Sequence, residues 1–444
     1  MQRRLVVWSC WSFMLLVPSV AAAQTSQNRT TTLSSVFQNL FGPNGLVVDS
    51  QAVLPDGSTH SAHFNSAFQS NFTQFNVALA SQLTSLPLPS PASGFTYRFD
   101  QGTGTFIRST QSFGPILTDR AETIGRGRFS FGYTYQFFSF DQLEGIDLTR
   151  VPSVFTHDDF QLGGGRTDVV TTRNTIDASV GQWTGALTYG LTDRLDLSVA
   201  VPIVSTHLEV ISAATIERVG TLGSPNVHFF ADPDAPGGFG SERTFSAGGS
   251  ASGIGDIIMR LKGSLLRSAG SGLSVGVDVR APTGDERNLL GSGAAGVKPF
   301  VAASWTLKRF APRVNLGYQW NGSSVLAGDP ETGRKADLPD QGLYAVGADF
   351  GVSDRFSLTG DWLGRYAIDS PRVSVHTFTP AGSPVGFDDM IFGTSSYWAS
   401  SAAMGCKANV GGRVLIDFNL RFTVDNNGLT DRVTPLIGVE YGFK

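Results

Sequence analysis

The sequence predicts an all-β fold, a transmembrane antiparallel β-barrel of about 12 strands with a partly helical N-terminal region. Three observations support this prediction. The hairpin pattern at Trp183–His207 is echoed at residues 349–362, and both contain the break Gly-x-Ser/Thr-Asp-Arg. From Gly125 onward apolar side chains alternate with polar or small ones, as in strands whose two faces differ. Short and long connections between the expected strands nearly alternate, which is typical of outer-membrane barrels.

The first 23 residues have the pattern of a secretory signal peptide. Two arginines precede the apolar run Leu5–Val20, and three alanines follow it,. Without these residues only Cys406 remains, so we expect no intramolecular disulfide and no Cys-rich metal site,. The formal charge of −4 becomes −6 when the two signal arginines are removed. An acidic chain of this kind gives no reason to expect nucleic acid as a partner.

Residues 24–124 differ from the rest of the chain because their apolar residues recur at helical spacing. Two stretches, 33–41 and 64–83, follow this rule,. The second stops before a run of prolines, and a β-like segment, Gly94–Arg108, follows,. Two interpretations remain open, a small periplasmic appendage and a hatch inside a barrel lumen. In the second, four phenylalanines would offer an apolar surface to an aromatic ligand: Phe64, Phe68, Phe72 and Phe75.

Residues 125–444 are predicted to form the barrel. The first strand contains Phe129, Phe131, Tyr133, Tyr135 and Phe137 on one face,. Eleven further strands are expected at 172–190, 195–208, 254–266, 273–284, 295–307, 312–322, 341–351, 355–367, 396–409, 412–425 and 432–443,. An even strand number places both ends of the chain in the periplasm.

The connections between these strands include long loops at 141–171, 209–253, 323–340 and 368–395. Alternate residues of the last strand are apolar up to Phe443, and only Lys444 follows. Such endings resemble the signal by which bacterial barrels are recognised by the barrel-assembly machinery. Hydrocarbon cannot satisfy free backbone groups, so the strands must close on themselves and face lipid and lipopolysaccharide in the bacterial outer membrane. Outward aromatic residues near strand ends would form a girdle: Trp183, Trp305, Trp320, Trp362 and Tyr366,.

The inward parity carries the charged residues. The lumen candidates are Arg128, Asp196, Arg260, Lys262, Asp278, Arg280, Asp349, Asp361, Arg365, Asp417, Arg421 and Glu440, with Asn315, Gln319 and Asn419 beside them. Six of the charged residues are acidic and six are basic. A pore that selects by charge carries an excess of one sign, so equal numbers of acidic and basic residues favour a lumen that contains salt bridges.

No motif indicates a cofactor or a metal. The Gly-rich sequence Gly291–Gly296 matches a dinucleotide pattern, but it precedes an alternating strand rather than a helix and indicates a flexible outer loop,. A barrel enzyme remains an alternative class because Ser205 and His207 share a strand face. The pair lacks a third catalytic member and oxyanion donors. A structural or adhesive barrel, with loop 209–253 as its binding surface, is the other alternative.

Several segments carry a resemblance to a known family: 114–138, 189–205, 253–266, 277–301 and 350–362. In these segments the chain resembles the outer-membrane transporter family named after the MetA-pathway of phenol degradation. The resemblance implies a channel that passes small hydrophobic or aromatic compounds by passive diffusion, with or without a gate. The fatty-acid-transporter type of barrel is similar in plan, although its Asn-Pro-Ala hatch motif is absent here.

Overall fold

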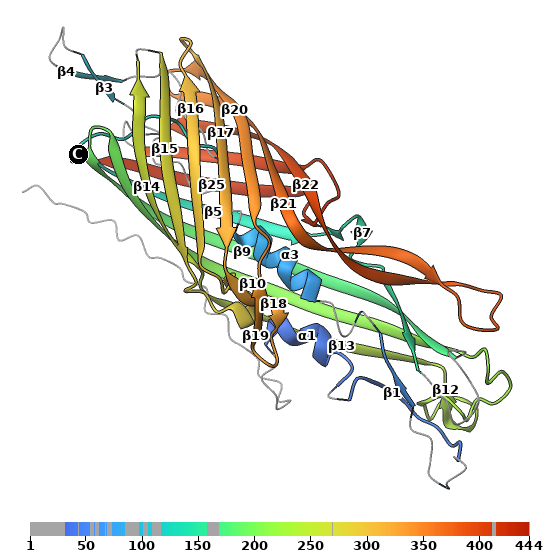
Figure 1. The fold of residues 1–444 in the computed structure, drawn as a ribbon. Coiled ribbons are helices and arrows are strands. Elements are labelled where there is room, and N and C mark those ends of the chain that lie inside the picture. Colours follow the sequence, from blue (N-terminus) through green and yellow to red (C-terminus); the bar gives the residue numbers. More distant parts are fainter. Residues whose placement is uncertain are drawn as a thin grey trace, which may run out of the picture. The chain divides into compact units, whose positions relative to one another are not determined.

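The computed structural model describes residues 32–42, 44–53, 57, 62–66, 68, 73–84, 97–100, 105–108, 117–157, 168–268, 270–410 and 414–443. Fourteen described strands are hydrogen-bonded into one antiparallel sheet. Twelve of them close into a ring, and the other two pair with strands of this ring without belonging to it. Figure 1 shows this ring of long strands. In ring order, its strands are β5 (Phe129–Phe140), β9 (Val169–Thr192), β10 (Leu195–Glu217), β14 (Ile257–Arg267), β15 (Ser271–Ala281), β16 (Gly296–Trp305), β17 (Phe310–Asn321), β20 (Gln341–Ser353), β21 (Phe356–Phe378), β22 (Phe387–Asn409), β23 (Val414–Thr423) and β25 (Val433–Phe443).

The predicted barrel of about 12 strands is therefore confirmed. Closure occurs where β25 pairs with β5, for example Val439 with Tyr133. Each expected strand overlaps one observed strand of the ring. The closed ring leaves no unpaired strand edge in the lipid, as a membrane-spanning sheet requires.

The two echoed breaks in the sequence are the same tight turn. In the turn between β9 and β10 the amide of Arg194 donates to the hydroxyl of Thr192 at 3.1 Å. Between β20 and β21 the amide of Arg355 donates to the hydroxyl of Ser353 at 3.3 Å. A hydroxyl that accepts from the amide two residues on stabilises a turn. These turns mark the short-turn end of the barrel, which is the periplasmic end by the loop asymmetry of such barrels.

Outward and inward faces separate as the alternation predicts. Along β10, Leu197, Val199 and Ile203 are 40%, 38% and 50% exposed, whereas Asp196 is 1% exposed. The four girdle tryptophans are exposed on the outer face, and Tyr366 is half-buried. The exposed apolar side chains form the surface that faces lipid in the outer membrane,.

Four strands of the ring are much longer than a membrane needs. β9 has 24 residues and β10, β21 and β22 have 23 each, whereas a spanning strand needs about 9–11. The extra length extends the wall at the long-loop end, so residues expected in loops 209–253 and 368–395 are partly strand. Their exposed side chains include charged ones, such as Asp177 and Glu209, which a surface beyond the lipid tolerates.

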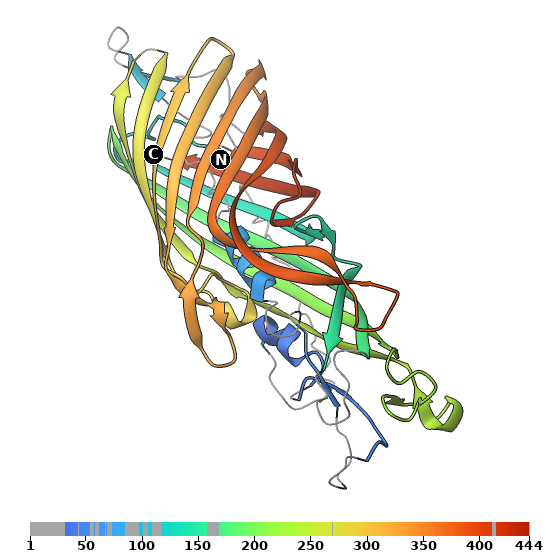
Figure 2. The ribbon, with the colours of Figure 1, turned by 45° about the vertical axis from the view of Figure 1, so that its right-hand side comes forward.

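The remaining elements at the long-loop end are short strands and turns, with one longer strand that pairs with β10. They are β6 (Gln142–Leu143), β7 (Ile146–Asp147), β8 (Val151–Thr156), β11 (Phe230–Ala231), η2 (Pro236–Gly238), β12 (Phe239–Gly240), β13 (Glu242–Ile254), η3 (Glu286–Asn288), β18 (Ser323–Asp329), β19 (Arg334–Asp337) and β24 (Leu429–Thr430). β8 and β13 pair with the extended parts of β9 and β10. Figure 2 shows the extended strands from a second side.

The N-terminal region contains η1 (Leu33–Ser35), α1 (Val36–Asn39), β1 (Leu46–Val48), β2 (Ala62–Phe64), α3 (Thr73–Thr84), β3 (Tyr97–Asp100) and β4 (Thr105–Arg108). The expected helix over 64–83 is wrong at its start, because Phe64 lies in β2 and pairs with Leu46 of β1. Hydrogen bonds between Asn65 and Thr156 continue this extended backbone onto β8. None of the described helices is long and apolar enough to span a membrane.

Candidate functional site

The described residues between Thr32 and Thr84, here called the apolar plug, share one hydrophobic core with the barrel wall. The rings of Phe68 and Phe75 lie 6.0 and 5.5 Å from the ring of Phe37. The same core contains inward residues of the ring, among them Val204 and Leu208 of β10. In Figure 1, α1 and α3 lie among the strands toward the long-loop end. Burial of this apolar surface stabilises the position of the plug.

Backbone pairing fixes the outer part of the plug to the loops. Asp49 exchanges two hydrogen bonds with Phe229, at 2.9 and 3.0 Å, and Asn65 exchanges two with Thr156. The residues adjacent to Phe229 and Thr156 are His228 and His157, which are buried, and their Nε2 atoms lie 3.1 Å apart. The plug contributes to this pair because the ring of Phe64 stacks on His157 at 4.3 Å.

Asp168, just before β9 and outside the membrane-spanning part, orients the histidine pair. Its carboxylate lies 2.7 Å from Nδ1 of His228. Burial alone would raise the pKa of Asp168, but hydrogen bonds from His228 and Thr221 outweigh it and hold the pKa well below the usual range,. The amides of Val219 and Gly220 donate to the same carboxylate. Asp168 is therefore ionised throughout the neutral range.

A second chain segment, Leu117–Ile124, crosses the lumen at the short-turn end and is here called the polar strap. Its backbone bonds to the wall at several points. The amide of Ile124 donates to the carboxylate of Asp196 at 3.0 Å, and Nζ of Lys262 donates to the carbonyl of Glu122 at 2.9 Å. The amide of Asp119 and the side chain of Asn315 form two reciprocal bonds through the Asp119 backbone, at 2.7 and 2.8 Å.

An ion pair attaches the strap to β20, and a hydrogen bond attaches it to β21, beside a cluster of wall charges. Arg313, 1% exposed as a side chain, bridges the carboxylates of Asp349 and Asp361. Arg120 of the strap also binds Asp349, at 2.6 Å. Thr118 donates to Asp361 at 3.1 Å. Every charge in this cluster has an opposite charge beside it, which buried ions require.

A parallel cluster lies on β14, β15 and β16. Arg260 binds Asp278 through two hydrogen bonds, at 2.6 and 2.8 Å, and Asp119 of the strap through a third at 2.8 Å. Lys298 adds a second positive charge 2.8 Å from Asp278. Bidentate pairing of this kind fixes geometry as well as charge.

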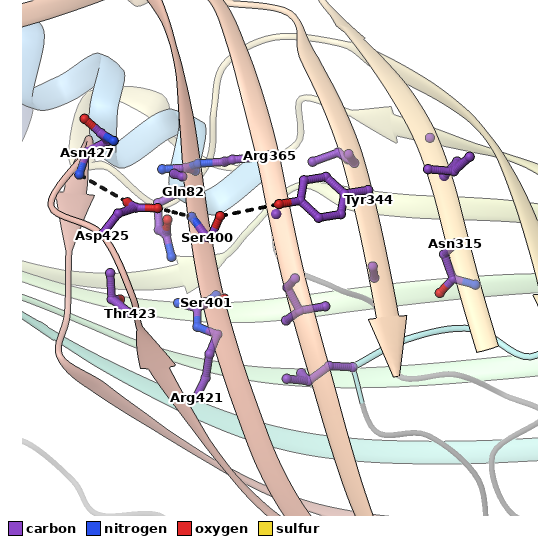
Figure 3. Close-up of a pocket in the computed structure, with 18 of the residues that line it drawn as sticks. Gln82, Asn315, Tyr344, Arg365, Ser400, Ser401, Arg421, Thr423, Asp425 and Asn427 are labelled. Carbon is purple, nitrogen blue, oxygen red and sulfur yellow. Dashed lines mark hydrogen bonds between the residues drawn. The ribbon is translucent and has the colours of Figure 1, made fainter. Parts of the chain in front are cut away.

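Between the plug and the strap lies a cavity of about 170 Å³. Its lining includes Gln82 of the plug, Leu117 of the strap, and Phe300, Leu363 and Arg421 of the wall. Figure 3 shows Arg365 and Arg421 together with Ser400, Ser401 and Asp425, and Asn315 farther along the sheet. The volume is comparable to that of an engineered cavity of roughly 150 Å³ that binds benzene.

The structure places the lumen candidates in four groups. Asp196, Arg260, Lys262, Asp278, Asp349 and Asp361 contact the strap or its partners, and Arg365 and Arg421 line the cavity. Asp417 and Glu440 lie on β23 and β25, where Glu440 binds Lys407 at 2.8 Å. Arg280 donates to Asn321, and Arg128 is half-buried just before β5.

Of the hatch candidates, Phe64, Phe68 and Phe75 are buried in the plug, and Phe72 lies outside the described residues. The sequence analysis missed Arg313, Lys298 and Lys407, although each has the inward parity of its strand. It also missed the strap charges Asp119 and Arg120. Their only sequence signal is a cluster of charges just before the first strand.

Two motifs have a structural explanation. The expectation that Gly291–Gly296 is a flexible outer loop is wrong, because Gly291 and Ser292 are buried and the carboxylate of Asp256 accepts from the Ser292 amide at 2.8 Å. Ser205 is exposed on the outer face, and His207 bonds to Ser250 of β13. Among the described residues, no group of three or more His, Cys, Asp and Glu side chains could hold a metal ion.

The closed ring, its apolar outer face and its charged interior define a transmembrane β-barrel of the bacterial outer membrane,. The family model described as "Putative MetA-pathway of phenol degradation" matches residues 183–338, which confirms the predicted resemblance over this range. Among curated protein sequences, none matches this chain.

Solved outer-membrane barrels share the general plan at low identity. The COG4313 outer membrane channel from Pseudomonas putida F1 is 15% identical, with a TM-score of 0.44 over 73% of this chain and 98% of that one. The CymD monoaromatic hydrocarbon channel is 11% identical, with a TM-score of 0.36 over 72% and 89%. The Pseudomonas putida toluene transporter TodX is 8% identical, with a TM-score of 0.33 over 71% and 90%. At such TM-scores the likeness supports no functional argument.

Proposed function

We propose that this chain is an outer-membrane channel that passes small hydrophobic or aromatic compounds by passive diffusion, with the apolar plug and the polar strap as its gate. The observation that carries the proposal is the cavity of about 170 Å³, which is lined mainly by the wall and also by Gln82 of the plug and Leu117 and Asp119 of the strap. A single aromatic ring fits such a volume. The strap continues into β5 through residues 125–128, and the other contacts described here for the plug and the strap are noncovalent, so both can be displaced without breaking the barrel.

Energy coupling is not needed for this function. The barrel has too few strands to enclose a large folded plug domain, which barrels of about 22 strands do. Solutes would enter from the long-loop end past the plug, occupy the cavity, and leave past the strap.

The partners of the barrel follow from its surface. Outer-membrane lipid and lipopolysaccharide would surround the exposed apolar residues. The barrel-assembly machinery would recognise β25, whose Val433, Ile437, Val439 and Tyr441 are exposed on one face. An added charge at Ile437 is expected to reduce the amount of barrel in the outer membrane, measured by immunoblotting of membrane fractions. Equal amounts of variant and unaltered barrel would contradict this proposal.

A reversible cross-link between strap and wall tests the gate. The amide of Ala121 lies 3.1 Å from the hydroxyl of Ser304 on β16, so Ala121→Cys with Ser304→Cys, in a Cys406→Ser background, would join them when oxidised. The measurement is uptake of benzyl alcohol and of a disaccharide by proteoliposomes. We expect benzyl alcohol uptake faster than that of empty liposomes in the reduced protein only, and disaccharide uptake in neither state.

The single variants Ala121→Cys and Ser304→Cys are the controls, because they cannot form this disulfide. Equal benzyl alcohol uptake by the oxidised and reduced double variant would exclude the strap as a gate. Uptake no faster than that of empty liposomes in every state would exclude the channel itself.

A further inference from the structure

The lining of the cavity between the plug and the strap contains both apolar and charged side chains. The apolar residues include Leu117 of the strap, Leu363 of β21 and Phe300 of β16. The charged residues include Arg365 and Arg421. Figure 3 shows both arginines at the cavity. A purely apolar solute would use only the apolar residues.

The remaining basic residues that line the cavity are already paired with carboxylates. Arg260 binds Asp119 and Asp278, and Lys298 binds Asp278. Their charges are balanced inside the wall and strap. Neither residue has to bind a solute to be neutralised.

Arg421 differs from these residues. Its side chain makes one hydrogen bond within the described part of the chain, from Nη2 to the hydroxyl of Thr434 at 3.3 Å. The ring of Phe138 lies 5.2 Å from its Cζ, and its buried Nε has no hydrogen-bond partner. No carboxylate of the described residues lies within 4.0 Å of it in an ion pair. An arginine has five N–H donors in a planar fork, so most of this fork is available to a ligand.

Two acidic residues that line the cavity, Asp425 and Asp431, accept hydrogen bonds from other donors. Asp425 accepts from the amides of Ser400 and Asn427, at 2.5 and 3.2 Å. Asp431 accepts from the amide of Val433 and the hydroxyl of Thr434, both at 3.1 Å. Asp431 attracts Arg421 electrostatically, but neither carboxylate forms a direct ion pair with it. The N–H groups of Arg421 can therefore still bind an anion in the cavity.

We propose that the cavity is a binding site for small aromatic carboxylates, with the carboxylate on Arg421 and the ring against Leu117, Leu363 and Phe300. Arginine matches a carboxylate through two parallel N–H···O bonds. A ring against these apolar residues loses contact with water while the anion keeps hydrogen-bond partners. The inference rests on the proposed channel function and names the class of solute for which the cavity is built.

Equilibrium binding to the full mature chain in detergent tests this site directly. Benzoate and benzamide are the probes, because they share ring and size and differ in charge. Isothermal titration should show benzoate binding about tenfold more tightly than benzamide, the difference expected for hydrogen bonds to a charged group. Arg421→Gln should remove that preference, and Arg421→Lys should keep part of it because the charge remains.

Arg432→Gln is the matched control, since Arg432 is 77% exposed as a side chain and pairs with Asp141 away from the cavity. It should bind both probes as the unaltered chain does. Heat-modifiability on gels verifies that each variant is a folded barrel. If Arg421→Gln does not fold, the benzoate preference of Arg421→Lys against that of the unaltered chain decides the question.

Uptake of benzyl alcohol by proteoliposomes, measured beside the binding, separates the two proposals. Uptake together with equal binding of benzoate and benzamide would overturn the carboxylate site and leave the channel intact. Absence of both uptake and binding would overturn both. Preferential benzoate binding that Arg421→Gln abolishes would support the site.

Discussion

At the long-loop end, the apolar plug contacts the barrel wall through buried phenylalanine, leucine and valine side chains. At the short-turn end, the polar strap contacts the wall through ion pairs and backbone hydrogen bonds. Apolar packing has little directional preference, so small movements of the plug change its energy gradually. Charge-assisted hydrogen bonds depend on geometry. The strap is therefore expected to be either fully seated or released.

Pairing between the strap and the wall also explains why acidic and basic residues of the lumen occur in similar numbers. Each strap residue with a charge meets a partner on the wall, and each wall cluster is complete only when the strap is present. Releasing the strap would leave Asp349 and Arg260 with fewer partners in a space that water enters. Opening at this end exchanges protein contacts for hydration, whereas opening at the other end exposes apolar surface.

The largest effect is expected when the central cluster at the short-turn end loses its cation. Arg313→Leu leaves Asp361 without an ionic partner and Asp349 with Arg120 alone. Removing one partner of a buried pair costs about 3–5 kcal/mol. The midpoint of urea unfolding in lipid vesicles should fall accordingly. Arg309→Leu, at an exposed turn, is the control, and an equal midpoint for both variants would contradict the assignment.

A substitution in the core of the plug should destabilise the plug without destabilising the barrel. Phe75→Ala removes a fully buried ring that contacts Phe37 and is expected to destabilise the plug by about 3 kcal/mol. Hydrogen exchange in α3 should become faster while exchange in β14–β17 stays unchanged. Val53→Ala, at a position 65% exposed, should change neither. Faster exchange throughout the barrel would show that plug and wall unfold as one unit.

The carboxylate of Asp168, beside the histidine pair, predicts a pH-dependent contribution at the outer edge of the plug. Asp168→Asn removes charge-assisted hydrogen bonds worth about 2 kcal/mol. Because the pKa of Asp168 is lowered in the folded chain, the stabilisation is complete above the ordinary aspartate pKa of about 4 and decreases below it.

Protease protection of the plug, measured from pH 7 to pH 3, gives this dependence. The difference between Asp168→Asn and the unaltered chain should be largest at pH 7 and should shrink below about pH 4. Asp234→Asn, in an exposed loop at the same end, should match the unaltered chain. A difference that grows toward pH 3 would have the wrong sign.

The smallest effect is expected for one strap contact. Asp119→Asn keeps the backbone bonds to Asn315 and removes the ion pair with Arg260, which still has Asp278. The loss should be about 1 kcal/mol. Maleimide labelling of a cysteine at Ala121 should become several-fold faster, whereas Asp354→Asn should leave it unchanged. Equal labelling rates would show that the Asp119 pair does not hold the strap.

The barrel was predictable from the sequence because lipid imposes one rule on every strand. Residues such as Leu197, Val199 and Ile203 must be apolar where hydrocarbon surrounds them. Beyond the membrane this rule ends. The Gly- and Ser-rich strand β13 was missed for that reason, because the face that packs on the core has only Phe245, Ala247 and Ala251 beside glycines.

The site was less predictable because it depends on contacts between distant segments. Inward parity identified Arg260, Asp278 and Arg421, and the same rule extends to Arg313. Parity says nothing about which charges are neutralised. Only the position of the strap shows that Arg260 has Asp119 as a partner and that Arg421 is left for a solute. The helical spacing from Phe64 was misleading because β2 pairs with β1 and β8 and overrides that local pattern.

Planar-bilayer conductance tests most directly whether the lumen is closed independently at two ends. The proteins are residues 24–444, residues 114–444, residues 24–444 with Asp119→Asn and Arg120→Gln, and residues 114–444 with both substitutions. If the two ends close independently, the last protein should show steady conductance and the other three little. Steady conductance from unaltered residues 24–444, or from residues 114–444 without substitutions, would show that the two ends do not close independently.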